Sequence, residues 1–434
     1  MKKSIRIGLL GLGTVGTGVV RILEKNRRLI EKRIGLPLEV VKIAVRDPTK
    51  ERQVPLPKGI LTSDPFEVIA DPSVDIVVEL IGGCEPAKQL SLAAIEQRKH
   101  LVTANKALLA EYGPEICKEA IEKGVNLGFE ASVGGGIPVI KTIREALAAN
   151  HILSVYGIIN GTSNYILTKM RDEERSFQDV LLEAQNAGYA ESDPTFDVEG
   201  IDSAHKLAIL VNLAFGIPVK PNEIYTEGIT EISPVDIEFG REFGYTLKLL
   251  AIAKALDGEL DVRVHPTMVP DGTPIAKVGG VYNAVEVVGD SVEDLMLFGR
   301  GAGEGPTASA VVSDIMDISR DMEASRGSAL PSDISTAGEI TRVKPIASIS
   351  SLYYLRFMVA DRPGVLSQIS SQLGSNNISI ESVIQKGWET GSPVPLVIMT
   401  HKAVERDIQL ALQEINKLSC ITEKPVLIRV EAEE

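Results

Sequence analysis

Residues 5–16 of the chain read IRIGLLGLGTVG, and this stretch decides the fold. Residues 5–10 form an apolar run typical of a buried strand, and a G-x-G-x-x-G pattern follows directly. Gly11 permits a tight turn, Gly13 lets the backbone approach a pyrophosphate, and Gly16 lets a helix pack closely on the strand. The start of that helix would then face the phosphates. We therefore predict a dinucleotide site formed by six consecutive residues: Gly11, Leu12, Gly13, Thr14, Val15 and Gly16.

The second predicted strand, residues 38–45, ends at Arg46 and Asp47. The residue at this place meets the adenosine ribose in dinucleotide-binding folds. An acid accepts a hydrogen bond from the 2′-hydroxyl of NAD, whereas an arginine suits the 2′-phosphate of NADP. The two adjacent residues point to different coenzymes. We favour NADP(H) over NAD(H), with Arg46 as the contact; the alternative is that Arg46 is a solvated loop residue.

Apolar strands and helices continue to alternate to about residue 130. Strands are predicted at residues 74–80, 100–103 and 125–129, and helices at residues 87–97 and 114–123. Repeated βα units imply a doubly wound parallel sheet, so we predict an α/β Rossmann domain over residues 1–134. Ligands of such sheets lie at the carboxyl ends of the strands. Thr103 and Lys106 follow one strand and are expected beside the cofactor, although Lys106 would need no explanation as a surface lysine.

Residues 130–138 read EASVGGGIP and leave the predicted sheet. Three consecutive glycines allow the backbone to approach a ligand or an ion closely. Exposed carbonyls together with Glu130 could hold a hard cation through oxygen. A flexible hinge between domains explains the same residues equally well, and both interpretations stay open.

Asp202 and Lys206 stand four residues apart at the start of a predicted helix, which places them on one face. The residues that follow, 207–213, are apolar on nearly all sides and indicate a buried helix. A lysine at the mouth of such a helix would be partly desolvated, which lowers its pKa toward neutrality. We regard Lys206 as a candidate acid and base; the alternative is an ordinary helical ion pair.

Carboxylates are concentrated just before this helix. A helix predicted at residues 177–187 stops at Gly188, and five acids follow within about a dozen residues: Glu191, Asp193, Asp197, Glu199 and Asp202. They are either a solvated acidic loop or a pocket for the ammonium group of an amino-acid substrate.

Period-two patterns dominate after Pro221. We predict a hairpin at residues 247–256 and 260–264, strands at 284–288 and 294–298, and an α+β substrate and dimerisation domain over residues 135–304. A glycine-rich loop at residues 299–305 precedes a helix that we expect to return to the nucleotide domain. That loop would close over the cofactor. Residues 305–351 comprise this helix and a linker.

Residues 352–431 follow the order βαββαβ, which predicts a ferredoxin-like domain. The turn Asp361-x-Pro363-Gly364-x-Leu366 and the sequence Asn376-Asn377-Ile378 resemble the ACT regulatory module. The resemblance implies amino-acid binding between paired copies, and hence a homo-oligomer.

The bulk composition is that of an ordinary globular protein. The chain has 434 residues, 44% hydrophobic residues and a formal net charge of −14, which argues against nucleic acid or an anionic membrane as a partner. No apolar run reaches the length of a membrane span, and residues 1–4 lead straight into the first strand rather than into a signal peptide. Cys84, Cys117 and Cys420 are scattered, which favours a reducing cytoplasm.

Taken together, these motifs resemble homoserine dehydrogenase of the long form with a fused ACT domain. The most specific matches are GYAESDP at residues 188–194 and DVEGIDSAHK at residues 197–206; GLGTVG, TANK (103–106) and NGTSN (160–164) support them. The family implies NAD(P)-dependent, reversible reduction of L-aspartate 4-semialdehyde to L-homoserine, on the route to threonine, methionine and isoleucine. It also implies feedback inhibition, with threonine as the expected effector, and a homodimer or homotetramer.

The resemblance also assigns residue roles. Lys206 would be the acid and base, Lys106 would contact substrate and cofactor, and Glu191 and Asp202 would bind substrate, as would the Gly188 backbone. Glu130 with the carbonyls of Val133, Gly135 and Ile137 would hold a sodium (or potassium) ion. Gly303 would contact the nicotinamide nucleotide.

Two rival functions remain. Aspartate-semialdehyde dehydrogenase needs an activated cysteine nucleophile, for which Cys84 is the only plausible candidate, although no histidine partner is suggested by spacing. A non-catalytic amino-acid sensor would use the nucleotide domain only structurally, and the intact Asp202/Lys206 pair argues against it.

Overall fold

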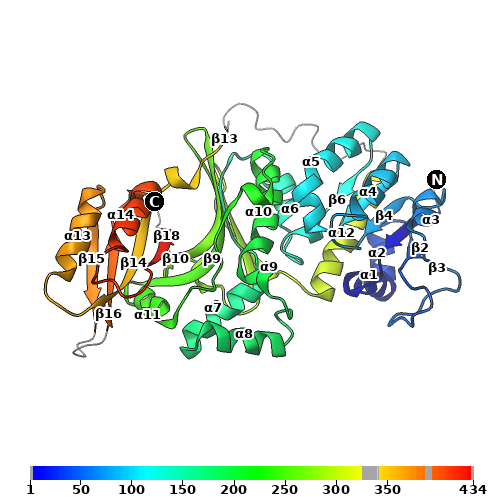
Figure 1. The fold of residues 1–434 in the computed structure, drawn as a ribbon. Coiled ribbons are helices and arrows are strands. Elements are labelled where there is room, and N and C mark those ends of the chain that lie inside the picture. Colours follow the sequence, from blue (N-terminus) through cyan, green and yellow to red (C-terminus); the bar gives the residue numbers. More distant parts are fainter. Residues whose placement is uncertain (1–2, 325–339, 341, 387–392, 432–434) are drawn as a thin grey trace. The chain divides into compact units, whose positions relative to one another are not determined.

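The computed structural model describes residues 3–324, 340, 342–386 and 393–431 (Figure 1). The chain divides into two compact units, and each is described by itself. The first unit comprises Met1–Gly161, Asp202–Ile224 and Tyr282–Glu339. The second comprises Thr162–Ile201, Tyr225–Val281 and Ile340–Glu434.

The first unit contains the parallel sheet that the glycine motif predicts. Its strands follow the order β3-β2-β1-β4-β5-β6, and every pair is parallel. The strands are β1 (Ile5–Leu10), β2 (Leu38–Ala44), β3 (Leu61–Thr62), β4 (Ile76–Glu79), β5 (His100–Thr103) and β6 (Leu127–Gly128). The connecting helices are α1 (Thr14–Lys25), α2 (Arg27–Ile34), α3 (Pro65–Ala70), α4 (Ala87–Glu96) and α5 (Lys106–Lys123). The order reverses between β1 and β4, as in a doubly wound fold.

Helix α5 begins eight residues before the predicted start at Pro114. The Asn105 side chain caps it by accepting a hydrogen bond from the Leu108 amide at 3.1 Å. Pro114 lies within the helix rather than at its start, which is where proline is usually found. As a result Lys106 is the first helical residue, directly beyond the carboxyl end of β5.

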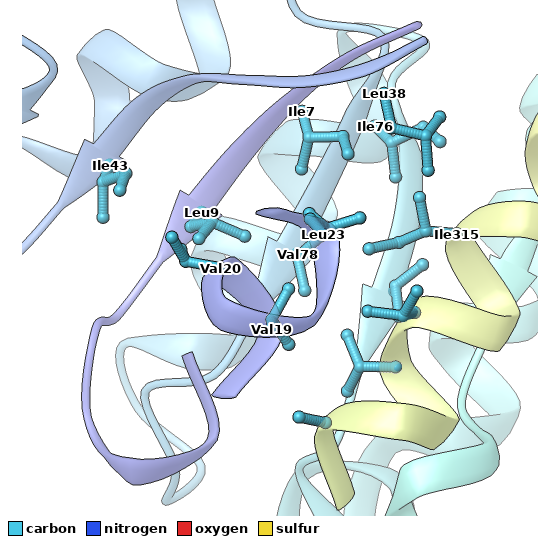
Figure 2. Packing of buried hydrophobic residues seen from close by; sticks show 14 of the residues in the cluster. Ile7, Leu9, Val19, Val20, Leu23, Leu38, Ile43, Ile76, Val78 and Ile315 are labelled. Carbon is cyan, nitrogen blue, oxygen red and sulfur yellow. The ribbon is translucent and has the colours of Figure 1, made fainter. Parts of the chain in front are cut away.

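Helix α12 (Glu304–Glu323) belongs to the same core although it is nearly 300 residues from α1 in sequence. Figure 2 shows Ile315 of α12 directed into the cluster that contains Val19 and Leu23 of α1 and Ile76 and Val78 of β4. All five side chains are at most 8% exposed. The helix therefore closes one face of the nucleotide-binding sheet.

The rest of the first unit surrounds a buried helix. Strands β7 (Ile152–Ile158), β11 (Tyr282–Gly289) and β12 (Glu293–Arg300) form an antiparallel ribbon with β11 in the middle. Short helical turns precede it: η1 (Glu130–Ser132), α6 (Val139–Lys141) and the π-helix η2 (Thr142–Ala146). Helix α10 (Ile201–Phe215) starts at the boundary of the two units and is buried on nearly all sides, as its sequence predicts. A last turn, η3 (Pro221–Glu223), follows.

The second unit contains the rest of the middle region. Its helices are α7 (Gly161–Glu173), α8 (Phe177–Asn186), α9 (Thr195–Val198), α11 (Pro234–Glu242) and the turn η4 (Ile275–Lys277). Strands β9 (Tyr245–Leu256) and β10 (Glu259–Pro270) form the expected hairpin, and the short β8 (Tyr225–Thr226) pairs with β10. The second hairpin strand runs past the predicted end at Val264, because Pro266 is accommodated opposite Leu249.

The C-terminal part has the predicted βαββαβ order. It consists of β14 (Ser350–Ala360), α13 (Val365–Ser375), β15 (Ile380–Gln385), β16 (Pro393–Thr400), β17 (Ala403–Val404), α14 (Glu405–Ile415) and β18 (Val426–Val430). The main strands are ordered β18-β14-β16-β15, and β18 also pairs in parallel with β10. The predicted linker contains β13 (Arg342–Val343) and η5 (Ile346–Ser348); residues 325–339 and 341 lie outside the described part. Among the described helices, none has the length and apolar character that a membrane span requires.

Candidate active site

A buried carboxylate organises the predicted catalytic residues. Asp202, in the first turn of α10, is 2% exposed and accepts hydrogen bonds from Lys206 Nζ at 2.7 Å and from Asn160 Nδ2 at 2.8 Å. Lys106 Nζ forms an ion pair with its second oxygen. Lys206 also donates to the carbonyl of Ile159 at 2.6 Å. The start of α10, the end of β7 and the start of α5 thus meet around one carboxyl group.

The two lysines of this cluster stabilise the charged form of Asp202. Burial alone would raise the pKa of Asp202, but the ammonium groups of Lys206 and Lys106 lower it well below the usual range. The Lys206 side chain is 11% exposed, whereas that of Lys106 is 37% exposed. The buried Lys206 ammonium group donates to two acceptors, the Asp202 carboxylate and the Ile159 carbonyl. The arrangement presents a positioned ammonium group that can give up or take back a proton.

Thr103 lies at the carboxyl end of β5, as predicted, and bonds a carboxylate that the sequence analysis missed. Its hydroxyl donates to Glu79 Oε2 at 2.6 Å and accepts from the Asn105 amide at 3.0 Å. Glu79 is fully buried at the end of β4 and also accepts from the Ile81 amide at 2.7 Å. The one acid in an otherwise apolar strand end was the signal that could have identified it. Asn160 was likewise missed as a partner of Asp202.

The glycine turn has room for a dinucleotide. Gly11 has a φ of +104°, and a Cβ there would lie 2.8 Å from the Leu80 carbonyl oxygen. A Cβ at Gly16 would lie 2.6 Å from the Gly11 carbonyl oxygen, which fixes how closely α1 approaches β1. At Gly13, by contrast, nothing lies within 4 Å of the Cβ position. Gly13 is also the N-cap of α1 and has no side chain to bond the first amides of the helix. Open space beside uncapped amides fits a pyrophosphate.

The two residues after β2 have different environments. Arg46 is exposed. Asp47 Oδ1 accepts from the amide of Thr49 at 2.9 Å and from its hydroxyl at 2.6 Å, and these bonds lower the pKa of Asp47. Its carboxylate therefore stabilises the following turn.

The loop after β6 is buried rather than hinge-like. Residues 131–135 are all buried, and the Gly136 amide bonds the Arg300 carbonyl at 3.1 Å. A Cβ at Gly135 would lie 2.5 Å from the Gly301 carbonyl oxygen, so the two glycine loops are in direct contact. Close packing of this kind contradicts a flexible hinge. Gly303, at the end of the second loop, has a φ of +117° and is the N-cap of α12.

Glu130 sits behind this loop. Its carboxylate is 2% exposed and accepts from the amides of Ile140 at 2.9 Å and Lys141 at 2.8 Å. Burial, together with the charge of nearby Asp314, raises the pKa of Glu130 to about 7 despite these bonds. In the described residues no donor reaches the carbonyls of Val133 or Gly135, whereas that of Ile137 accepts from Val139 at 2.8 Å. A carboxylate and carbonyl oxygens within one loop are ligand types that suit a hard monovalent cation.

The acidic residues that precede α10 do not act as one group. Asp193, just before α9, accepts from the Thr195 amide at 3.1 Å, and Glu199 accepts from the Thr230 hydroxyl at 3.2 Å. These partners favour the acidic-loop alternative for Asp193 and Glu199. Gly188 has a φ of +74° just after α8, and the exposed Glu191 follows it. Both belong to the second unit, whereas Asp202 and Lys206 belong to the first.

Cys84 does not have the properties of a catalytic nucleophile. Burial and the charges of Glu111 and Glu85 raise the pKa of its thiol. A nucleophilic cysteine needs the opposite shift, toward the thiolate.

Comparisons with known proteins identify the family to which the chain is similar. Residues 138–316 match the family model described as homoserine dehydrogenase, residues 11–130 match its NAD-binding domain, and residues 353–420 match the ACT domain. A homoserine dehydrogenase of Neisseria gonorrhoeae is 46% identical over 433 residues, covering 99% of both chains.

Solved structures show the same relationship. The crystal structure of a homoserine dehydrogenase from Thiobacillus denitrificans has a TM-score of 0.92 at 46% identity and covers 99% of this chain and 98% of that chain. A hyperthermophilic archaeal homoserine dehydrogenase in complex with NADPH is more distant, with a TM-score of 0.61 at 26% identity, covering 73% of this chain and 97% of that chain. The chain is thus similar to the Neisseria gonorrhoeae and Thiobacillus denitrificans proteins over nearly its whole length.

Proposed function

Because this chain belongs to the homoserine dehydrogenase family, we propose that it interconverts L-homoserine and L-aspartate 4-semialdehyde, with Lys206 as acid and base. The alcohol is oxidised to the aldehyde with loss of a hydride and a proton; the reverse reaction restores both. The observation that carries the proposal is the Asp202 carboxylate, which holds the ammonium groups of Lys206 and Lys106 together.

The proposed role of Lys206 follows from charge. As the aldehyde is reduced, negative charge develops on its oxygen, and a positioned ammonium group stabilises that charge and delivers a proton. Asp202 keeps Lys206 in place and charged, while the more open Lys106 adds positive potential. We assign Glu191 and the Gly188 backbone to the amino-acid end of the substrate, since carboxylates and carbonyls accept from an ammonium group.

A nicotinamide cofactor supplies or accepts the hydride. Residues 11–16, Thr103 and Lys106 would hold it, together with Gly303 at the start of α12. We favour NADP(H) because Asp47 is already bonded to Thr49 while Arg46 is exposed. The NADPH complex of an archaeal relative supports this coenzyme. Glu130 and the carbonyls of Val133, Gly135 and Ile137 would hold a sodium ion that stabilises the loop.

The ACT domain is proposed to bind an amino-acid effector, for which threonine is the first candidate. Pairing of ACT domains would make the enzyme a homodimer or homotetramer. The function itself belongs to amino-acid biosynthesis, and we retain the prediction of a cytoplasmic location, with which the three free thiols of the described residues are compatible.

The decisive experiment replaces Lys206 with Ala. We expect kcat to fall by about 10²- to 10⁴-fold, because the proton donor is lost, while NADPH still binds with nearly unchanged affinity. Steady-state assays at 340 nm and NADPH fluorescence titration measure the two quantities. Lys99→Ala is the matched control, since Lys99 is also partly buried but bonds the carbonyls of Asp71 and Val74. Full activity of Lys206→Ala would remove the assignment.

A further inference from the structure

A cavity of about 440 Å³, outside the candidate active site, lies in the second unit between α7, α11, β9 and η4. Four cationic side chains line it, Arg171, Arg241, Lys248 and Lys277, with a single carboxylate, Asp271. This excess of positive charge occurs in a chain whose formal net charge is −14. Four cations close together repel one another, and a bound anion would relieve this repulsion.

Lys248 is the informative residue of this group. It is 1% exposed, and its ammonium group donates to the Val278 carbonyl at 2.5 Å and to Asn164 Oδ1 at 3.4 Å. Both acceptors are neutral. Nowhere in the described part of the chain does a carboxylate form an ion pair with Lys248. Asp172 acts on Lys248 only through its charge. A buried ammonium group with no ion-pairing carboxylate is rare in folded proteins.

The other cations are placed toward solvent. Arg241 and Lys277 are exposed, and Lys277 donates only to the Gly272 carbonyl at 3.4 Å. Arg171 is the exception, because it bonds Asp172 at 2.8 Å. The lone lining carboxylate, Asp271, accepts from the Thr246 hydroxyl at 2.5 Å. The cavity therefore has a buried ammonium group at one place and exposed cationic side chains elsewhere along its wall.

We propose that this cavity binds a small polyvalent anion, a phosphate or a dicarboxylate, which serves as the missing counter-charge for Lys248, Arg241 and Lys277. Apolar walls from Leu167, Ile237 and Leu247 would accommodate a short carbon chain. The site consists of residues that the proposed reaction does not use.

The test measures binding of inorganic phosphate and of succinate to the full-length protein by calorimetry. Saturating NADPH is present so that phosphate cannot report on the nucleotide site. We expect saturable binding of one anion per chain. If only phosphate binds, the ligand is a phosphate. If only succinate binds, the ligand is a dicarboxylate. If both bind, the site accepts either kind of anion.

The variant Arg241→Gln/Lys277→Gln is expected to weaken that binding by about tenfold or more, because two exposed charges of the wall are removed. Lys25→Gln/Lys118→Gln is the matched control: both lysines are exposed, and the change in net charge is the same. Lys248→Met should abolish the rise in thermal midpoint that the anion produces. Absence of saturable binding of both anions, or equal affinity in the two double variants, would overturn the proposal.

Discussion

At the scale of single residues, the structure distinguishes three kinds of buried charge. Asp202 is buried with two ammonium partners, Glu130 with two backbone amides, and Lys248 with neutral acceptors only. Asp202 therefore belongs to a complete ion-pair cluster, whereas Glu130 and Lys248 have no ion-pair partner among the residues that the structure describes. We expect a cation to bind near Glu130 and an anion to bind near Lys248.

Because of Lys248, we expect the free energy of unfolding to rise with pH. Burial, with repulsion from Arg171, lowers its pKa from 10.5 to about 8. Between these values the unfolded chain binds a proton that the folded chain has released, so the free energy of unfolding rises with pH over this window. Relative to Lys248→Met, the wild type should gain on the order of 3 kcal/mol between pH 7.5 and 10.5. Urea unfolding in buffers free of phosphate and carboxylates measures this; parallel pH curves for both proteins would contradict it.

We predict that sodium ions stabilise the folded protein by binding near Glu130. Sodium chloride should raise the thermal midpoint relative to tetramethylammonium chloride at equal ionic strength, since a bound cation offsets the buried carboxylate. A sodium concentration ten times the dissociation constant of the site raises the free energy of unfolding by about 1.4 kcal/mol. The variant Glu130→Gln should respond equally to both salts. If the wild type also responds equally to both salts, the ion site is wrong. Differential scanning calorimetry provides the measurement.

At the scale of elements, the nucleotide site depends on two helices distant in sequence. Helix α12 packs against α1, and Gly18 is the point of closest approach: a Cβ there would lie 2.8 Å from Ala308 Cβ and 3.0 Å from the Glu304 carbonyl oxygen. Because Gly13 and Gly303 are the N-caps of these two helices, their packing sets the spacing of the two glycine turns.

We therefore expect Gly18→Val to push α12 away from α1. Overpacking of this size lowers the free energy of unfolding by about 1–3 kcal/mol. The Michaelis constant for NADPH should rise more than that for homoserine, because both glycine turns belong to the proposed cofactor site. Lys25→Val, on the exposed face of the same helix, is the control for the β-branched residue itself. An unchanged constant for NADPH in Gly18→Val would show that the helix spacing does not matter for binding.

At the scale of the whole molecule, the ACT domain is joined to the middle region within the second unit. Arg429 of β18 is fully buried and forms ion pairs with Glu405 of α14 at 2.6 Å and with Glu227 at 2.7 Å. Glu227 lies in a loop whose Ile229 amide bonds the Val198 carbonyl at 2.8 Å, four residues before Asp202. A chain of contacts thus leads from the ACT sheet to Val198, in the segment that precedes the proposed substrate-binding carboxylate in sequence.

Glu227→Gln should weaken control by the effector without changing the basal rate, because Arg429 keeps Glu405 while losing its charged link to the loop. We expect the threonine concentration for half-inhibition to rise about fivefold or more, which corresponds to roughly 1 kcal/mol of coupling. Glu231→Gln, an exposed residue of the same loop, is the matched control. Equal threonine sensitivity of both variants would exclude this route, and an uninhibited wild type would exclude threonine as the effector.

The sequence by itself determined the fold classes, and it predicted the candidate residues of the active site. Strand–glycine turn–helix, period-two hairpins and the βαββαβ order are local patterns, and local patterns are set by backbone geometry and hydrophobic periodicity. The pairing of Asp202 with Lys206 was also readable, since a spacing of four is a property of one helix.

Only the tertiary structure decided which distant residues complete the sites. Lys106 and Asn160 join Asp202 from other elements, Glu79 bonds Thr103 from a neighbouring strand, and four cations gather around one cavity. By contrast, Asp193, Glu199 and Asp202, which are close together in sequence, have separate hydrogen-bond partners. Hydrogen bonds and ion pairs act over a few ångströms through space, so packing, not sequence separation, selects the partner of each charge.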